Sequence, residues 1–208
     1  MTTDTSSSIS TVYVVDDDAS VRESLSSLIR SAGMSVEVFA SPLDFLALDK
    51  FSEFSCVVLD VRMPGLDGLA LQDKIAELGR EIPIIFITGH GDVPLAVRAM
   101  KAGAIDFLNK PFNDTDLLKA IALAMSRVSA SSQERMELAD LRLRVDTLTP
   151  REKQIMYEVA LGKQNKCIAY DLCVTESTVK VHKHNVMSKM NLRSTAELML
   201  AIQRLKKS

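Results

Sequence analysis

The stretch TVYVVDDDAS, residues 11–20, places three consecutive aspartates directly after an apolar, β-branched run. The run predicts a buried strand, because Val, Thr and Tyr favour extended backbone. Three carboxylates in a row bring no evident benefit to folding, since like charges at close range repel each other. The stretch therefore predicts a strand whose carboxyl end carries functional charge.

The same stretch begins a repeating pattern that predicts an α/β domain over residues 11–127. Strand-like apolar runs cover 11–15, 35–39, 56–59, 82–87 and 105–108, and helical patterns cover 20–32, 42–49, 68–78, 92–102 and 114–128. Five strands alternating with five helices indicate a doubly wound parallel sheet with helices on both faces. Gly33 and Gly103 are placed to end helices, and Ser41-Pro42 is placed to begin one. Such sheets bind ligands at the carboxyl ends of their strands.

Those strand ends carry a consistent set of polar side chains, namely Asp16 and Asp17 after the first strand, Asp60 after the third, Thr88 after the fourth and Lys110 after the fifth. Carboxylates at close range need a cation, and oxygen ligands that leave room for water suit Mg²⁺. A carboxylate beside the metal can accept a phosphoryl group, whose oxygens a lysine and a hydroxyl can bind. Asp18, by contrast, is expected to cap the following helix.

Residues 11–127 resemble a response-regulator receiver domain, and LDVRMPGLDG (59–68), FITGHGD (86–92) and FLNKPF (107–112) carry the resemblance. The resemblance implies a flavodoxin-like sheet with strand order 2-1-3-4-5 and phosphorylation by a histidine kinase. The residue roles that it implies are Asp60 as phosphoacceptor, Mg²⁺ held by Asp16, Asp17, Asp60 and the backbone carbonyl of Arg62, phosphoryl contacts from Thr88 and Lys110, a switch aromatic at Phe107, and a cis Lys110–Pro111 bond.

Residues 128–147 have no glycine or proline and carry many charges. Apolar side chains recur at steps of three and four, at Leu138, Leu141, Val145 and Leu148. This spacing predicts an amphipathic linker helix. Its apolar seam is shorter than a coiled coil needs, although it could still pair in a dimer.

Residues 148–208 predict an all-α domain of four helices with a basic character. Residues 1–128 hold 11 Lys/Arg against 18 Asp/Glu, whereas residues 129–208 hold 14 against 9, so the net charge changes from −7 to +5. This asymmetry suggests a nucleic-acid partner for the second half. TPRE (149–152) and STAE (194–197) predict capping boxes. Helices over 165–172 and 176–190, separated by only CVT with Thr175 as N-cap, predict a helix-turn-helix.

Val179, Val186 and Met190 form an inward face on the helix 176–190, which leaves a basic face with an exposed Val181. A valine among lysines could contact a thymine methyl group. The domain resembles the LuxR-type helix-turn-helix of the NarL/FixJ regulators. The resemblance implies base contacts by Lys180, Val181 and His184, and phosphate contacts by Asn165, Lys166, Thr178, Lys183, Asn185 and Lys189.

Both resemblances together imply a phosphorylation-switched transcription factor and not an enzyme, similar to FixJ-like regulators of aromatic-compound catabolism, the styrene regulators among them. The implied partners are a histidine kinase, double-stranded promoter DNA, RNA polymerase and, on phosphorylation, a second copy of the chain. Two alternatives remain. VVDDDAS also fits a haloacid-dehalogenase-type phosphatase with Asp16 as nucleophile and Asp18 as acid/base. The chain could also bind DNA independently of phosphorylation.

The remaining features predict a cytoplasmic protein without a membrane segment. Residues 1–10 have neither the basic start nor the apolar core of a secretory signal and are expected to form a disordered lead. No apolar run is long enough to span a bilayer. Three cysteines, Cys56, Cys167 and Cys173, are expected to be buried or half-buried free thiols.

Overall fold

The computed structural model describes residues 10–89 and 93–207. The chain divides into two compact units, one up to Ser131 and one over Ser132–Ser208. Most of the lead expected over residues 1–10 lies outside the described residues, as does residue 92 at the expected start of a helix.

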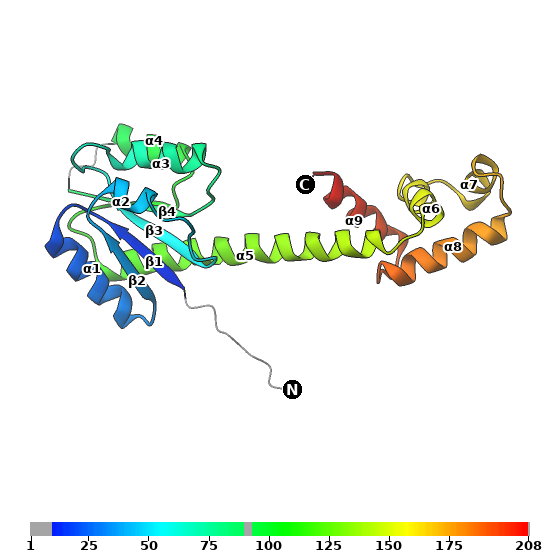
Figure 1. Ribbon diagram of the computed structural model, residues 1–208, viewed down its shortest axis with the longest axis horizontal. Helices are drawn as coiled ribbons and strands as arrows, with labels where there is room; N and C mark the ends of the chain where they lie inside the picture. The colour runs from blue at the N-terminus through cyan, green and yellow to red at the C-terminus, as the bar shows by residue number, and fades with distance from the viewer. Residues whose placement is uncertain (1–9, 90–92, 208) are drawn as a thin grey trace. The chain divides into compact units, whose positions relative to one another are not determined.

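The first unit contains a five-stranded parallel sheet (Figure 1). Its strands are β1 (Thr11–Val15), β2 (Ser35–Phe39), β3 (Ser55–Asp60), β4 (Ile84–Thr88) and β5 (Asp106–Asn109). The order β2-β1-β3-β4-β5 confirms the predicted doubly wound topology. β4 begins two residues later than its apolar run suggests, because Pro83 has no N–H to donate to the sheet.

Helices cover both faces of this sheet (Figure 1). α1 (Ala19–Ser31) and the first part of α5 (Asp114–Asp146) pack on one face, where the core is formed by residues such as Val14, Ile29 and Ile121. The other face carries α2 (Pro42–Leu46), α3 (Gly68–Glu77) and α4 (Val93–Lys101). Residues such as Phe45 and Leu71 are fully buried there. The strands β1, β3 and β4 are therefore buried on both faces, as their apolar runs indicated, whereas the edge strands β2 and β5 are partly exposed.

The predicted helix boundaries of this unit are largely confirmed. The Ser20 N–H donates to Asp18 Oδ1 at 2.8 Å, so Asp18 is the N-cap of α1. Ser41 caps α2 in the same way. Gly33 (φ 81°) and Gly103 (φ 94°) have the left-handed backbone expected after a helix end. α2 is shorter than predicted and ends at Leu46.

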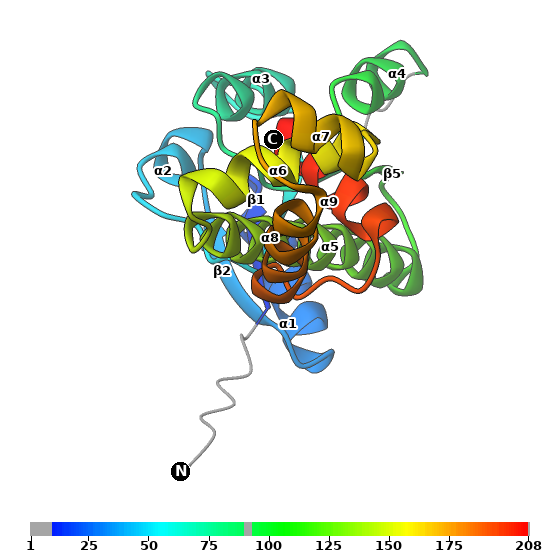
Figure 2. The same ribbon diagram turned by 90° about the vertical axis from the view of Figure 1, so that its right-hand side faces the viewer.

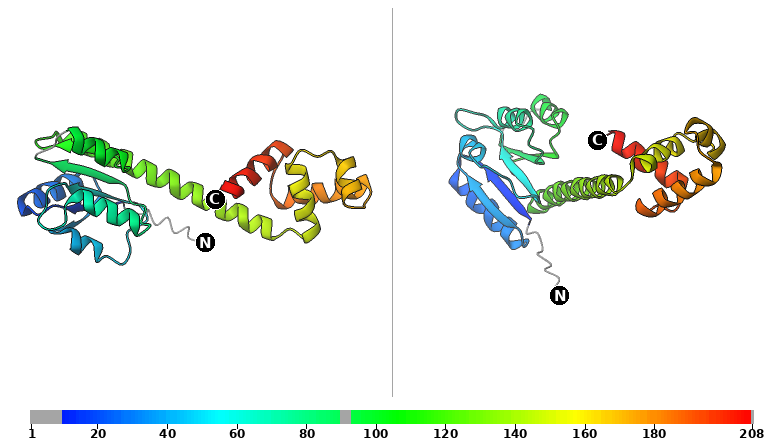
Figure 3. Two further views of the ribbon diagram at one scale, coloured as in Figure 1. Left: turned by 90° about the horizontal axis from the view of Figure 1, so that it is seen from above. Right: turned by 45° about the vertical axis from the view of Figure 1, so that its right-hand side comes forward.

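The expected linker helix is the C-terminal part of α5, which is one unbroken helix of 33 residues (Figure 3). The division between the two units falls within it, after Ser131. In the second unit, Leu141 and Leu148 are buried in the core and Val145 packs against them. Most apolar side chains of the seam therefore pack inside this unit, and few of them remain available for pairing with a second chain.

The second unit is entirely helical. It contains α6 (Pro150–Ala160), α7 (Asn165–Asp171), α8 (Glu176–Lys189) and α9 (Thr195–Lys207), in addition to the end of α5. α8 packs against α6 and α7, and α9 packs against α6 (Figure 2). The capping box at Thr149 and the Thr175 N-cap are confirmed. At STAE, Ser194 accepts from the Glu197 N–H, but Glu197 accepts from the Arg193 N–H, one residue before the expected donor.

Two further expectations concern membrane helices and thiols. Within residues 10–89 and 93–207, no helix combines the length and apolar character needed to cross a membrane. The three cysteines are free thiols, and Cys56 is buried as predicted. The prediction was wrong for Cys167 and Cys173, which are exposed. Cys167 lies on the outward side of α7, and Cys173 occupies the left-handed turn after this helix (φ 51°).

Candidate functional site

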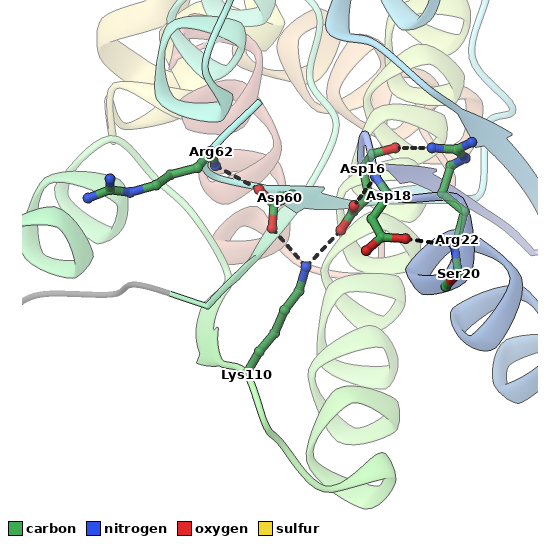
Figure 4. Close-up of polar contacts among 7 residues, drawn as sticks. All are labelled: Asp16, Asp18, Ser20, Arg22, Asp60, Arg62 and Lys110. Carbon is green, nitrogen blue, oxygen red and sulfur yellow. Dashed lines mark hydrogen bonds and ion pairs between the residues drawn. The ribbon is translucent and has the colours of Figure 1, made fainter. Parts of the chain in front are cut away.

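The carboxyl edge of the sheet brings together three of the predicted side chains (Figure 4). Asp16 follows β1, Asp60 ends the neighbouring strand β3, and Lys110 follows β5. The Lys110 ammonium lies between the two carboxylates, 2.8 Å from Asp16 Oδ2 and 2.8 Å from Asp60 Oδ1. The parallel topology thus places one cation between two acids that are 44 residues apart in the chain.

Asp16 is buried, and both its carboxylate and its backbone carbonyl accept hydrogen bonds. It is 1% exposed, and its second carboxylate oxygen accepts the Asp18 N–H at 2.9 Å. Its backbone carbonyl accepts a hydrogen bond of 2.6 Å from Arg22 of α1. This role of Arg22 was not predictable from the sequence, because no spacing rule links a helix residue to a carbonyl that precedes the helix N-cap.

Asp60 also has a partner at each carboxylate oxygen. Oδ1 contacts Lys110, and Oδ2 accepts the Arg62 N–H at 2.7 Å. The Arg62 side chain extends away from Asp60 (Figure 4), so only the backbone of Arg62 takes part. The backbone of Asp60 lies very close to Gly68. A Cβ atom added at Gly68 would lie only 2.3 Å from the Asp60 carbonyl oxygen. Glycine at position 68 therefore permits the close approach of α3 to the end of β3.

The other predicted residues of this edge lie on β4 and β5. Thr88 is the last residue of β4 and is 1% exposed. Its carbonyl accepts the Lys110 N–H at 2.7 Å, which fixes the backbone that carries the lysine. Phe107 is half-buried, with its ring 6.2 Å from that of Phe86. The Lys110–Pro111 bond is cis, as predicted.

The charges of this edge influence each other strongly. Burial raises the pKa of the Asp60 carboxyl above its usual value, and the nearby charge of Asp16 adds to this rise. Hydrogen bonds from Lys110 and from the Arg62 N–H oppose it. Burial alone would lower the pKa of Lys110, but its hydrogen bonds to Asp16 and Asp60 outweigh burial and raise it. The lysine is therefore firmly held as a cation.

The donor set is compatible with Mg²⁺ but does not form a complete cage. Among the described residues no three His, Cys, Asp or Glu side chains are grouped closely enough to hold a metal ion by themselves. Asp17 is exposed beside the buried pair. Two carboxylates share one ammonium, which leaves excess negative charge at the edge. Mg²⁺ typically uses one or two carboxylates and keeps several waters, so the oxygen donors fit this ion.

The second unit presents the predicted DNA-contacting side chains on α7 and α8. Val181 of α8 is 60% exposed, and Lys180 and His184 are exposed beside it. The remaining predicted contacts are exposed or half-buried, namely Asn165, Lys166, Thr178, Lys183, Asn185 and Lys189. The inward residues Val179, Val186 and Met190 are buried, so the two faces of α8 are as predicted.

Lys189 differs from the other predicted phosphate contacts, because its charge is already neutralised. Its ammonium lies 2.7 Å from Glu152 Oε2, and the Glu152 side chain is 4% exposed. The same carboxylate accepts the Thr149 N–H in the capping box of α6. These hydrogen bonds lower the pKa of Glu152 to about 2. The structure therefore favours a role for Lys189 in holding the end of α8.

His182 is a half-buried residue of α8 that was not among the predicted site residues. It lies one turn from both Val179 and Val186, and it is half-buried. Its Nδ1 is buried and has no hydrogen-bond partner among the described residues. The inward spacing could have been recognised from the sequence. By this spacing His182 belongs to the inward face of α8, whereas His184, two residues later, is exposed.

Comparisons with known proteins agree with this two-part organisation. Residues 12–122 match the response regulator receiver domain, and residues 146–202 match the luxR family of bacterial regulatory proteins. The response regulator protein TmoT of Ectopseudomonas mendocina is 47% identical over 96% of this chain and 90% of its own length. The transcriptional regulatory protein FixJ of Bradyrhizobium diazoefficiens is 44% identical over 90% and 91%. The solved structure of the response regulator StyR has a TM-score of 0.80 at 46% identity, covering 94% of this chain and 99% of its own.

Proposed function

This chain belongs to the response regulators that carry a LuxR-type DNA-binding domain, and it is therefore a phosphorylation-switched, DNA-binding transcription regulator. On this premise we propose that Asp60 is the phosphoacceptor. The observation that carries the proposal is the Lys110 ammonium, 2.8 Å from both Asp60 and Asp16. A carboxylate placed against a fixed cation at a strand end can attack a phosphoryl group whose charge the cation then stabilises.

The reaction transfers the phosphoryl group from a phosphohistidine of a kinase. An Asp60 carboxylate oxygen forms a bond to phosphorus while the bond from phosphorus to the imidazole nitrogen breaks, giving an aspartyl phosphate. Lys110 stabilises the charge on the phosphoryl oxygens, and the Thr88 hydroxyl donates to one of them. Mg²⁺, when bound by Asp16, Asp17, Asp60 and the Arg62 carbonyl, would supply the additional positive charge that these acids require.

The switch that follows involves Thr88, Phe107 and α4. Movement of Thr88 toward the phosphoryl group lets the Phe107 ring turn inward, and this changes the surface formed by α4 and β5. α4 offers three exposed apolar side chains for a new contact, since Val93, Val97 and Met100 are 76%, 45% and 45% exposed. We propose that two phosphorylated chains pair through this surface, shifting the population toward a dimer with two recognition helices.

The output is DNA binding by α8. Lys180, Val181 and His184 read base edges in the major groove, and the exposed cations and amides around them contact phosphates. Regulation of promoters also implies contact with RNA polymerase. The similarity to the response regulators TmoT and StyR, together with the sequence resemblance to FixJ-like regulators of aromatic-compound catabolism, supports, as a proposal, regulation of genes for the breakdown of aromatic compounds.

The decisive experiment is labelling with a small phosphodonor in the presence of Mg²⁺, comparing Asp60→Asn with Asp16→Asn and Asp18→Asn. We expect Asp60→Asn to abolish the covalent label and Asp18→Asn to retain it, because asparagine caps a helix as well as aspartate does. The phosphatase alternative requires the opposite, with the label lost in Asp16→Asn and retained in Asp60→Asn. Full labelling of Asp60→Asn would contradict the proposal.

Phosphorylation-independent DNA binding is tested in the same variants. We expect the phosphorylated wild-type chain to sediment as a larger species and to bind promoter DNA more tightly, whereas Asp60→Asn stays at the unphosphorylated level for both. Identical mass and DNA affinity with and without the phosphodonor would support the phosphorylation-independent alternative.

A further inference from the structure

A shallow depression lies beside α8, on the side from which the chain continues toward α9. Lys180, Lys183, His184, Met187, Leu192 and Arg193 line it, with Ser188. Met187 and Leu192 contribute apolar surface to it, and the cationic side chains of Lys180, Lys183 and Arg193 line it together with His184. No carboxylate side chain of the described residues lines it. Arg193 does not belong to α8 and is absent from the predicted DNA contacts.

The turn that ends α8 brings Arg193 to this position. Asn191 has a left-handed backbone (φ 53°), and its N–H donates to the Ser188 carbonyl at 3.1 Å. The Leu192 N–H donates to the Met187 carbonyl at 2.9 Å. This pair of bonds is the Schellman motif, in which the chain reverses and an apolar residue returns onto the last helical turn. Arg193 therefore comes back alongside the helix that it follows.

The backbone N–H of Arg193 is hydrogen-bonded, whereas its guanidinium has no partner among the described residues. The Arg193 N–H donates to Glu197 Oε2 at 2.8 Å, and Ser194 caps Glu197 in turn. The Arg193 side chain is exposed, and it forms no ion pair or hydrogen bond with any described residue. The ordered backbone thus presents an arginine beside Lys180 and Lys183, and the side chains of these three residues form no ion pair or hydrogen bond with any described residue.

We propose that Arg193 binds a DNA phosphate, so that the DNA interface extends from α8 into the turn between α8 and α9. Arginine matches the geometry of a phosphate with two parallel N–H donors. A base contact is less suited to this position, because helix-turn-helix proteins read bases mainly from the first part of the recognition helix. This inference rests on the proposed DNA-binding role of α8.

The test measures the affinity of the full-length chain for two duplexes over a series of salt concentrations. One duplex is selected in vitro by the wild-type chain, and the other has an unselected sequence. We expect Arg193→Ala to weaken binding of both duplexes about three- to tenfold and to reduce the slope of log affinity against log salt by about 0.9, the value for one phosphate contact. Arg193→Lys keeps the charge and is expected to keep most of the slope.

Two matched variants separate charge from position. Lys206→Ala removes one exposed cation from the same unit outside the depression, and we expect an unchanged slope. Asn191→Gly keeps the left-handed turn and should bind normally, whereas Asn191→Val strains the turn and should lose affinity as Arg193→Ala does, although all charges remain.

The outcomes distinguish this inference from the proposed function. If the wild-type chain binds DNA and Arg193→Ala keeps the full slope, the Arg193 contact is overturned and the role of α8 stands. A loss confined to the selected duplex would indicate base reading and also overturn the phosphate contact. If the wild-type chain binds neither duplex, both proposals fail.

Discussion

The two candidate sites use positive charge in opposite ways. At the edge of the sheet, Lys110 is half-buried and shares two hydrogen bonds with carboxylates that are almost fully buried. On α8, Lys180 and His184 stand exposed and bind nothing in the described part of the protein. A covalent reaction benefits from a cation that is already in place in a site sheltered from water. Binding DNA benefits from cations that remain in water until they replace the counterions of the phosphates.

The strongest test of this contrast is Lys110→Met. Removing the fixed cation leaves Asp16 and Asp60 facing each other without compensation, so we expect the rate of labelling by a small phosphodonor to fall about 10²–10³-fold. Lys119→Met is the matched control, because Lys119 is exposed on α5. DNA binding by the unphosphorylated chain should be unaffected. Labelling of Lys110→Met at the wild-type rate would show that the cation is not preorganised for catalysis.

A second test removes charge from the other site. Lys180→Ala combined with Lys183→Ala should reduce DNA affinity about 10–100-fold at low salt and lower the salt slope by about 0.9, because only Lys183 is expected to contact a phosphate. Labelling of Asp60 should continue at the wild-type rate. Lys74→Ala with Lys119→Ala removes the same charge from the first unit and serves as control. Equal losses of affinity in both double variants would mean that net charge, and not the face of α8, determines binding.

A third test asks whether Lys189 is a paired cation that stabilises the fold or a free cation that binds DNA. Since it is paired with Glu152, we expect Lys189→Ala to lower the free energy of unfolding by about 1–3 kcal/mol, the contribution of a charged hydrogen bond. The salt slope of DNA binding should not change. A slope reduced by about 0.9 with unchanged stability would instead restore the phosphate contact predicted from sequence.

The same ion pair predicts a pH dependence. The folded-state pKa of Glu152, about 2, lies below its usual 4.5, so the folded chain binds fewer protons than the unfolded chain between these values. The stabilisation is therefore present above pH 4.5 and is lost as the pH falls toward 2. Glu152→Gln should flatten this part of the stability profile, measured by denaturant unfolding. An identical acid profile in wild type and variant would contradict the pairing.

The smallest expected effect concerns Val181. Because its side chain is 60% exposed, Val181→Ala should leave stability unchanged. If it contacts a thymine methyl, affinity for the selected duplex should fall by about 1 kcal/mol, roughly fivefold, with no change for an unselected duplex. Val181→Thr keeps one methyl group and should lose less. Equal losses on both duplexes would argue against a role in sequence reading.

The fold was predictable because its signals are local and repeated. The strands β1, β3 and β4 are largely apolar runs, and helix ends such as Asp18, Gly33 and Thr149 carry residues whose side chains or backbone suit the cap. The strand order came from the family resemblance. The hydrophobic periodicity could not show that α5 is a single helix that runs through both units. An amphipathic pattern predicts an apolar face, but it does not reveal that the first part of this face packs in one unit and the last part in the other.

The candidate sites were predictable to the extent that they depend on strand ends and helix faces. Asp16, Asp60 and Lys110 meet because parallel strands end at one edge. The contacts that were missed depend on three-dimensional proximity without a periodic signal. Arg22 reaches a carbonyl across a helix N-terminus, and Arg193 is returned to α8 by a reversed turn. The ion pair of Lys189 with Glu152 was also not predicted, because a lysine on a basic helix gives no sign of a buried carboxylate nearby.

The burial of Leu141 and Leu148 has a practical consequence for dividing this protein into parts. A fragment that begins at residue 149 would contain α6 to α9 but would lose two core side chains of the second unit, which α5 supplies. It would also lose Arg144, whose guanidinium donates to the Met190 carbonyl at the end of α8. An autonomous DNA-binding fragment should therefore start upstream of the seam, near residue 132, where the chain changes from one compact unit to the other.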